Sequence, residues 1–214
     1  MNSFVRLLGL LTLLPCALAY GQPPNVVLIV SDDQRWDSIN AIVPSSLLTP
    51  NLDSLATNGF VFSNARYHGS RNAAVCVSSR AQLFNGQNLW RSADNLTNRV
   101  TLGETLRARG YHAYITGKWH NENPGLQRSF TAGRNITPGF LSTPGYSGAF
   151  QTRNLTNGTL STFSNTGAHA TDLVGGTATN FLKTYNGTNR FFLYVAFNPH
   201  IASVTTKTPK GTKS

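Results

Sequence analysis

The segment Asn25-Val-Val-Leu-Ile-Val30, followed at once by Ser31-Asp32-Asp33, decides the fold class of this chain. An uninterrupted aliphatic run of this kind is typical of a strand that is buried on both faces of a parallel sheet. The acidic pair lies directly after the predicted strand. Because ligands bind beside the carboxyl ends of the strands in parallel α/β sheets, this junction is the first candidate site.

Further strands and helices alternate along the chain, which indicates an α/β fold with a mainly parallel sheet sandwiched by helices. Thr49-Pro50 is a helix N-cap with proline at the first helical position, and Gly59 follows that helix. Residues 121–165 are rich in Gly, Pro, Asn and Ser, and we expect a long surface excursion there. The predicted strands span 25–30, 60–62, 111–116 and 190–197, and the predicted helices span 50–58, 79–85, 101–109 and 168–185.

Three polar clusters each follow a predicted apolar strand: Asp32-Asp33, Gly117-Lys118-Trp119-His120 and Asn198-Pro199-His200. If these strands are parallel, their carboxyl ends meet at one edge of the sheet. Chance gives one such cluster easily, but three clusters indicate a site. The adjacent carboxylates suit a shared hard cation such as Ca²⁺ or Mg²⁺, since the chain has only 8 acidic residues. The alternative to a cation site is that one aspartate of the pair caps the N-terminus of a helix and that the other is merely solvated.

The composition excludes several other classes of protein. Charged residues make up 12% of the chain, about half of the roughly 25% usual in soluble domains, and 40% of the 214 residues are hydrophobic. This excludes a disordered tail, a coiled coil and a collagen-like chain. The net charge of +10 favours encounter with anionic substrates. Because the basic residues are scattered rather than gathered in a stripe, we expect no nucleic-acid partner.

Residues 1–19 are predicted to be a cleaved signal peptide. Arg6 precedes the apolar run Leu7–Leu14, which is too short to span a bilayer, and Ala17-Leu18-Ala19 is a small-x-small cleavage site. Lipidation of Cys16 is the alternative. No later stretch approaches the ~20 apolar residues of a membrane span. We therefore expect a secreted or extracellular protein, lysosomal or periplasmic in a suitable host, without a stable membrane anchor.

Sequons for N-glycosylation support export, although a chain rich in Thr and Asn also produces such triplets by chance. They begin at Asn95, Asn135, Asn154, Asn157 and Asn186. Export leaves Cys76 as the only cysteine of the mature chain, which is unusual in an oxidising compartment. Cys76 precedes a predicted helix whose N-terminus favours anions, and Arg80 follows one turn later. A buried, inert thiol is the alternative.

Four motifs together resemble those of the formylglycine-dependent sulfatases. Cys76-Val77-Ser78-Ser79-Arg80 is similar to the family's Cys-x-Pro-x-Arg signature, and Gly110–His120 resembles its second signature. Residues 25–33 resemble its opening strand with metal-binding aspartates, and Asn198-Pro199-His200 resembles its histidine loop. The resemblance covers residues 24–200 and implies the alkaline-phosphatase-like α/β sandwich.

The resemblance also implies a reaction, the hydrolysis of sulfate monoesters. In the family, a maturation enzyme oxidises the motif cysteine, here Cys76, to formylglycine, whose hydrated aldehyde is the nucleophile. Asp32, Asp33 and the modified Cys76 would then be ligands of a divalent cation, Ca²⁺ or alternatively Mg²⁺. The implied substrate is a sulfated small molecule or a sulfated carbohydrate.

The same resemblance assigns roles to the remaining candidate residues. Arg80 would hold the formylglycine hydrate, and Lys118 would bind a sulfate oxygen. His120 would assist the hydrate, while His200 would protonate the leaving alcohol or bind sulfate. Histidine suits general acid catalysis because its reference pKa of about 6.5 lies close to working pH. For Lys118, an ordinary solvated lysine is the alternative.

Two features depart from the family pattern. Ser78 stands where the family usually has proline or alanine, and residues 201–214 form a basic, polar tail without the family's later metal ligands or second lysine. We therefore divide the chain into a signal peptide, a sulfatase N-terminal catalytic region at 20–200 and this tail, and we expect the sulfatase fold to be incomplete at the C-terminus. A non-catalytic secreted protein with an anion-binding edge and a phosphatase or phosphonate hydrolase of the same superfamily are the alternatives.

Overall fold

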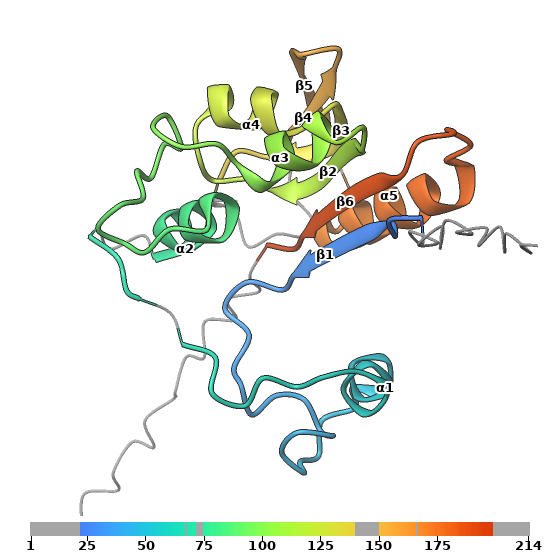
Figure 1. Cartoon of the computed structure of the whole chain (residues 1–214). Coiled ribbons are helices and arrows are strands. Elements are labelled where there is room, and N and C mark those ends of the chain that lie inside the picture. The colour runs from blue at the N-terminus through green and yellow to red at the C-terminus, as the bar shows by residue number, and fades with distance from the viewer. Residues whose placement is uncertain (1–21, 67, 72–74, 140–149, 166, 199–214) are drawn as a thin grey trace, which may run out of the picture.

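The computed structural model describes residues 22–66, 68–71, 75–139, 150–165 and 167–198 (Figure 1). No helix in these ranges is both long and apolar enough to cross a bilayer. The helices are α1 (Pro50–Asn58), α2 (Val75–Asn85), α3 (Leu102–Ala108), α4 (Asn123–Ser129) and α5 (Ala170–Thr184). The strands are β1 (Val26–Val30), β2 (His112–Lys118), β3 (Ala132–Thr137), β4 (Phe150–Thr156), β5 (Thr159–Asn165) and β6 (Phe191–Ala196).

The strands form one sheet in the order β1-β6-β2-β3-β4-β5. The first four strands of this order are parallel, and β4 and β5 form an antiparallel hairpin at the far edge. The prediction of a mainly parallel sheet is therefore confirmed. Val30 and Gly117 both lie opposite Ala196 of β6, so the carboxyl ends of β1, β6 and β2 meet at one edge of the sheet.

Helices cover both faces of the central strands, as the α/β prediction requires. Phe192, Tyr194 and Ala196 of β6 face one core, which also contains apolar residues of α2, α3 and α4. Leu193 and Val195 face the opposite core, beneath α5. Because both faces of β6 are buried, its sequence is apolar throughout rather than alternating.

Four aromatic rings fix the position of α2 on the sheet. Phe84 of α2 contacts Trp119 and Tyr194 edge-on, with both ring-centroid distances at 4.9 Å. Phe130, directly after α4, packs 5.9 Å from Phe84. Edge-to-face pairs of this kind add about 0.5–1.5 kcal/mol each beyond the burial of their surface. These contacts hold the last turn of α2, which contains Phe84, against Trp119 and β6.

The expectation that β1 is buried on both faces is wrong. Its alternate residues Val27 and Ile29 are 46% and 57% exposed, while the residues between them pack on the core. The reason is the position of β1 at the sheet edge, since α5 packs over β2, β3 and β6. Helix α1 contributes no buried residue and lies apart from the sheet in Figure 1.

Three other expectations about the elements need correction. The segment 60–62 is not a strand, and Phe60 is exposed. The predicted surface excursion at 121–165 contains α4 and the strands β3, β4 and β5. Helix α2 already begins at Val75 rather than Ser79. The missed strands are rich in Thr and Asn, so pairing with their neighbours, rather than an apolar pattern, makes them strands.

Candidate functional site

The edge where β1, β6 and β2 end brings the predicted polar clusters together. Asp32 follows β1, Lys118 ends β2 and Asn198 follows β6. The Lys118 Nζ atom lies 2.6 Å from Asp32 Oδ2, so side chains 86 residues apart in sequence form an ion pair. Convergence of the clusters is therefore confirmed for these residues, while Pro199 and the predicted site residue His200 lie outside the described residues.

Asp32, Lys118 and Arg80 form a buried ion trio. Arg80 Nη2 donates to the same Asp32 Oδ2 atom at 3.2 Å. The exposed fractions of the side chains are 7% for Asp32, 0% for Lys118 and 3% for Arg80. Burial alone would raise the pKa of Asp32, but the hydrogen bonds and positive charges of Lys118 and Arg80 hold this pKa below its ordinary value of 3.8. Asp32 is therefore an anion at neutral pH.

Arg80 is fixed by groups on two strands as well as by Asp32. Its Nη1 atom donates to the carbonyl oxygen of Lys118 at 3.0 Å and to the hydroxyl of Tyr194. Burial raises the pKa of Tyr194 to about 12, against the opposing effect of the Arg80 charge. Tyr194 therefore remains neutral and accepts the hydrogen bond. Sequence reasoning missed Tyr194, because only the register of β6 places it beneath α2.

The backbone at this edge adopts conformations that most residues avoid. Asp32 and Asp33 have φ of 60° and 49°, in the left-handed region, at a cost of about 1–3 kcal/mol each. Gly117 has φ of 89°, and a Cβ atom there would lie 1.8 Å from the carbonyl oxygen of Ala196. Only glycine allows β2 and β6 to approach this closely immediately before Lys118.

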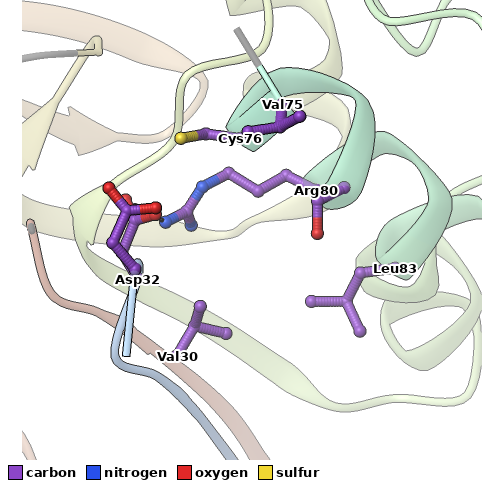
Figure 2. A pocket seen from close by; sticks show the side chains of 8 residues that line it. Val30, Asp32, Val75, Cys76, Arg80 and Leu83 are labelled. Atoms are coloured by element: carbon purple, nitrogen blue, oxygen red, sulfur yellow. Dashed lines mark hydrogen bonds and ion pairs between the residues drawn. The ribbon is translucent and has the colours of Figure 1, made fainter. Parts of the chain in front are cut away.

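A cavity of about 210 Å³ opens beside the ion trio. The candidate ligand atoms of Asp32, Asp33 and Cys76 all lie within 4.8 Å of one another. Figure 2 shows the Cys76 sulfur and the Arg80 guanidinium facing the Asp32 carboxylate. Cys76 is half-buried and is the second residue of α2, not a residue preceding the helix as expected. The structure thus brings the three predicted metal ligands together.

His120 lies beside a different cavity, of about 550 Å³. Burial lowers the pKa of His120, the charges of Lys118 and Arg80 lower it further, and Asp32 partly opposes them. The imidazole is therefore neutral at neutral pH. Its Nδ1 atom is buried and has no hydrogen-bond partner among the described residues. His120 is close enough to interact electrostatically with the trio, but it does not line the cavity that contains Cys76.

Asn121 and Ser78 connect this histidine loop to the first turn of α2. Asn121 is buried, and its Nδ2 atom donates to the carbonyl oxygens of Val77 and Asp94. Ser78 Oγ donates to Asp94 Oδ1 at 2.8 Å and lies 2.9 Å from Ser70 Oγ. These contacts fix the turn that carries Cys76. Sequence reasoning missed Asn121 because loop-to-helix hydrogen bonds leave no periodic signal.

Asn198, the described member of the third cluster, has a structural role at the same edge. It is buried, and its amide exchanges hydrogen bonds with Thr137 Oγ1 at 3.2 and 3.3 Å. This pair joins the ends of β6 and β3.

A buried arginine and lysine share a carboxylate at the carboxyl edge of a parallel sheet, next to a helix N-terminus with a free cysteine. This arrangement defines an α/β protein whose candidate site combines fixed positive charges with a helix N-terminus, two features that attract anions. The Sulfatase family model matches residues 24–214, and the chain therefore belongs to the sulfatase family.

Comparison with individual proteins agrees with this assignment. The chain is 37% identical to human arylsulfatase A over 124 residues, which is 52% of this chain and 24% of the human protein. The chain thus spans about a quarter of the length of that relative.

Two solved structures show the fold. One, a protein in complex with its substrate D-glucosamine-2-N,6-O-disulfate, has a TM-score of 0.61 at 21% identity over 82% of this chain and 34% of that protein. A Vibrio parahaemolyticus protein in the alkaline phosphatase superfamily has a TM-score of 0.52 at 19% identity, over 91% of this chain and 44% of that protein. The predicted alkaline-phosphatase-like fold is therefore confirmed.

Proposed function

We propose that this chain hydrolyses sulfate monoesters and that Cys76, converted to formylglycine, is the nucleophile. The observation that carries the proposal is the position of Cys76 beside the ion trio, with its sulfur within 4.8 Å of both aspartate carboxylates. Membership of the sulfatase family supports it. A hydrated formylglycine supplies one hydroxyl that attacks sulfur and a second hydroxyl that later releases sulfate.

The residues around Cys76 have separate tasks in this proposal. Arg80, fixed by Tyr194 and Asp32, holds the hydrate and offsets the negative charge of the sulfate group. Lys118 supplies a second positive charge from a fully buried position and binds a sulfate oxygen. Fixed charges in a buried site stabilise a developing anion without reorganising, which is the largest effect available to such a site.

Asp32 and Asp33 would hold a divalent cation together with the modified Cys76. The donor chemistry fits a hard cation, Ca²⁺ or alternatively Mg²⁺, because two of the three groups are carboxylates. Ca²⁺ takes about 6–8 oxygen ligands, and these three groups supply only part of that shell. We therefore expect weak Ca²⁺ binding by the described residues, and calorimetric titration would measure it.

Two histidines complete the proposed reaction. His120 assists the hydrate, and its lowered pKa keeps the imidazole neutral, the form that can accept a proton. His200 protonates the leaving alcohol or binds sulfate. The substrate is a sulfated small molecule or a sulfated carbohydrate, and the net charge of +10 favours its approach.

The proposal includes export and maturation. The predicted signal peptide at residues 1–19 places the protein outside the cytosol, secreted or in a lysosome or periplasm according to the host. A formylglycine-generating enzyme is then the partner that acts on Cys76.

Peptide mass spectrometry tests the nucleophile directly. In a host with the maturation enzyme, the peptide that contains Cys76 and ends at Arg80 should carry an aldehyde in place of the thiol. Because Ser78 replaces the usual proline or alanine, we expect partial conversion, and Ser78→Pro should increase the converted fraction. Cys76→Ala, which has no thiol to oxidise, is the negative control. A known sulfatase expressed in the same cells shows that the maturation enzyme is active. If that sulfatase is converted while both the natural chain and Ser78→Pro keep the thiol, the proposed nucleophile is refuted.

A further inference from the structure

The Asn157 sequon lies at the tip of the β4–β5 hairpin. Strand pairing ends with Thr156 opposite Thr159, so Asn157 and Gly158 form a two-residue turn. Their φ angles of 49° and 78° are those of a type I′ turn, in which Asn-Gly is the preferred pair. Asn157, Gly158 and Thr159 are all exposed. A large group on the Asn157 amide would therefore extend into solvent.

The Asn186 sequon lies in the loop between α5 and β6. Asn186, Gly187 and Thr188 are all exposed. The loop is anchored beside them, since the Tyr185 hydroxyl donates to the carbonyl oxygen of Asn189 at 2.8 Å. A substituent on Asn186 would not disturb this anchor, because no contact of the Asn186 side chain contributes to it.

Both exposed sequons lie at the edge of the sheet opposite the candidate site. Thr156, directly before Asn157, pairs with Ala132, the first residue of the parallel strand β3. The loop with Asn186 precedes the first residue of β6. The candidate site lies at the carboxyl ends of the same parallel strands. Groups attached to Asn157 and Asn186 would thus leave the Cys76 cavity open.

Asn135, the first residue of a third sequon, is half-buried, unlike Asn157 and Asn186. It lies within β3, which pairs with β2 on one side and β4 on the other, and its Nδ2 atom donates to Thr177 Oγ1 of α5 at 2.7 Å. The sequon threonine, Thr137, is buried and bonded to Asn198. A glycan on the Nδ2 atom of this half-buried asparagine would displace the hydrogen bond to Thr177 and crowd the adjoining surface of α5. A glycan at this position therefore conflicts with the contact between β3 and α5.

We propose that Asn157 and Asn186 carry N-linked glycans and that Asn135 does not. The proposal rests on the export part of the proposed function and not on sulfate hydrolysis. In the reaction, Nδ2 of the asparagine forms a bond to C1 of an oligosaccharide carried on a lipid diphosphate. The bond from C1 to the diphosphate breaks, the amide loses one proton, and the lipid diphosphate leaves.

Glycopeptide mapping of the full chain tests the proposal. The chain is expressed with its own leader in a eukaryotic host, and the microsomal and secreted fractions are both collected. Each fraction is digested with a peptide N-glycosidase in water enriched in heavy oxygen, which marks every asparagine that carried a glycan. Asn157 and Asn186 should become aspartate with heavy oxygen, while Asn135 stays unlabelled. Thr159→Ala and Thr188→Ala should each remove one glycan, so each variant should migrate on a gel with an apparent mass lower by one glycan.

The matched controls are Thr159→Ser and Thr188→Ser, which keep the hydroxyl of each sequon and should keep the glycan. Heavy oxygen at Asn135 would overturn the proposal. It would also be overturned if the leader has been cleaved and Asn157 and Asn186 carry no heavy oxygen. A chain with an intact leader and no label would overturn its export premise, and with it the glycan assignment. None of these results bears on formylglycine at Cys76, which is read from a separate peptide.

Discussion

Replacement of Gly117 by alanine should abolish the native fold. The new Cβ atom would lie 1.8 Å from the carbonyl oxygen of Ala196, and both atoms belong to central strands that cannot move apart without breaking the sheet. Alanine also disfavours the φ of 89° at this position. We expect an insoluble chain, or a soluble chain without cooperative urea unfolding measured by circular dichroism.

Gly176→Ala is the matched control for this substitution. Gly176 lies on the exposed face of α5, and nothing lies within 4 Å of an added Cβ atom. Alanine in a helix interior should raise the free energy of unfolding by about 0.5–1 kcal/mol. Equal stability of the Gly117→Ala and Gly176→Ala chains would show that β2 and β6 do not approach as described.

Replacement of Asp32 by alanine is expected to lower the free energy of unfolding by about 3–5 kcal/mol, because the buried cations of Lys118 and Arg80 lose their shared carboxylate. Urea unfolding in the presence of a chelator measures this loss without any contribution from bound metal. Adding Lys118→Met should recover part of the loss, since it removes one uncompensated buried charge. Asp37→Ala, which breaks an exposed ion pair with Arg35, is the control and should leave the urea midpoint unchanged.

The same ion trio sets an acid limit on stability. The pKa of folded Asp32 is lowered from 3.8, so its contribution is fully present above that value and is lost as pH falls through the folded pKa. The Asp32→Ala chain should lack this part of the acid-induced loss. An Asp32→Ala chain as stable as Asp37→Ala at neutral pH would contradict the buried trio.

The sequence predicted those parts of the fold in which burial shapes composition. The central strands β2 and β6 are covered on both faces, so their apolar runs identify them, and Thr101 and Gly110 mark the ends of α3. The convergence of Asp32 and Lys118 followed from the rule that parallel strands end at one edge. Local sequence was sufficient for these features.

Other features depend on contacts between distant segments. Strands β3 to β5 carry Thr, Asn and Arg because one or both of their faces are partly solvated, so they have no apolar signature. Tyr194 belongs to the site only because the register places it beside Arg80. His120 is assigned by a motif, yet loop geometry places it beside a separate cavity. Register and loop geometry are properties of pairs of segments, which single-strand patterns do not encode.

The aromatic packing around α2 also gives the protein an optical reporter of its own site. Of the three tryptophans in the chain, Trp36 and Trp90 are 76% and 78% exposed, whereas Trp119, between Lys118 and His120, is 1% exposed. An aqueous quencher such as acrylamide therefore reaches the first two indoles and spares the third. The emission that survives quenching comes from the strand end that holds Lys118, so its wavelength reports the integrity of the candidate site separately from the rest of the molecule.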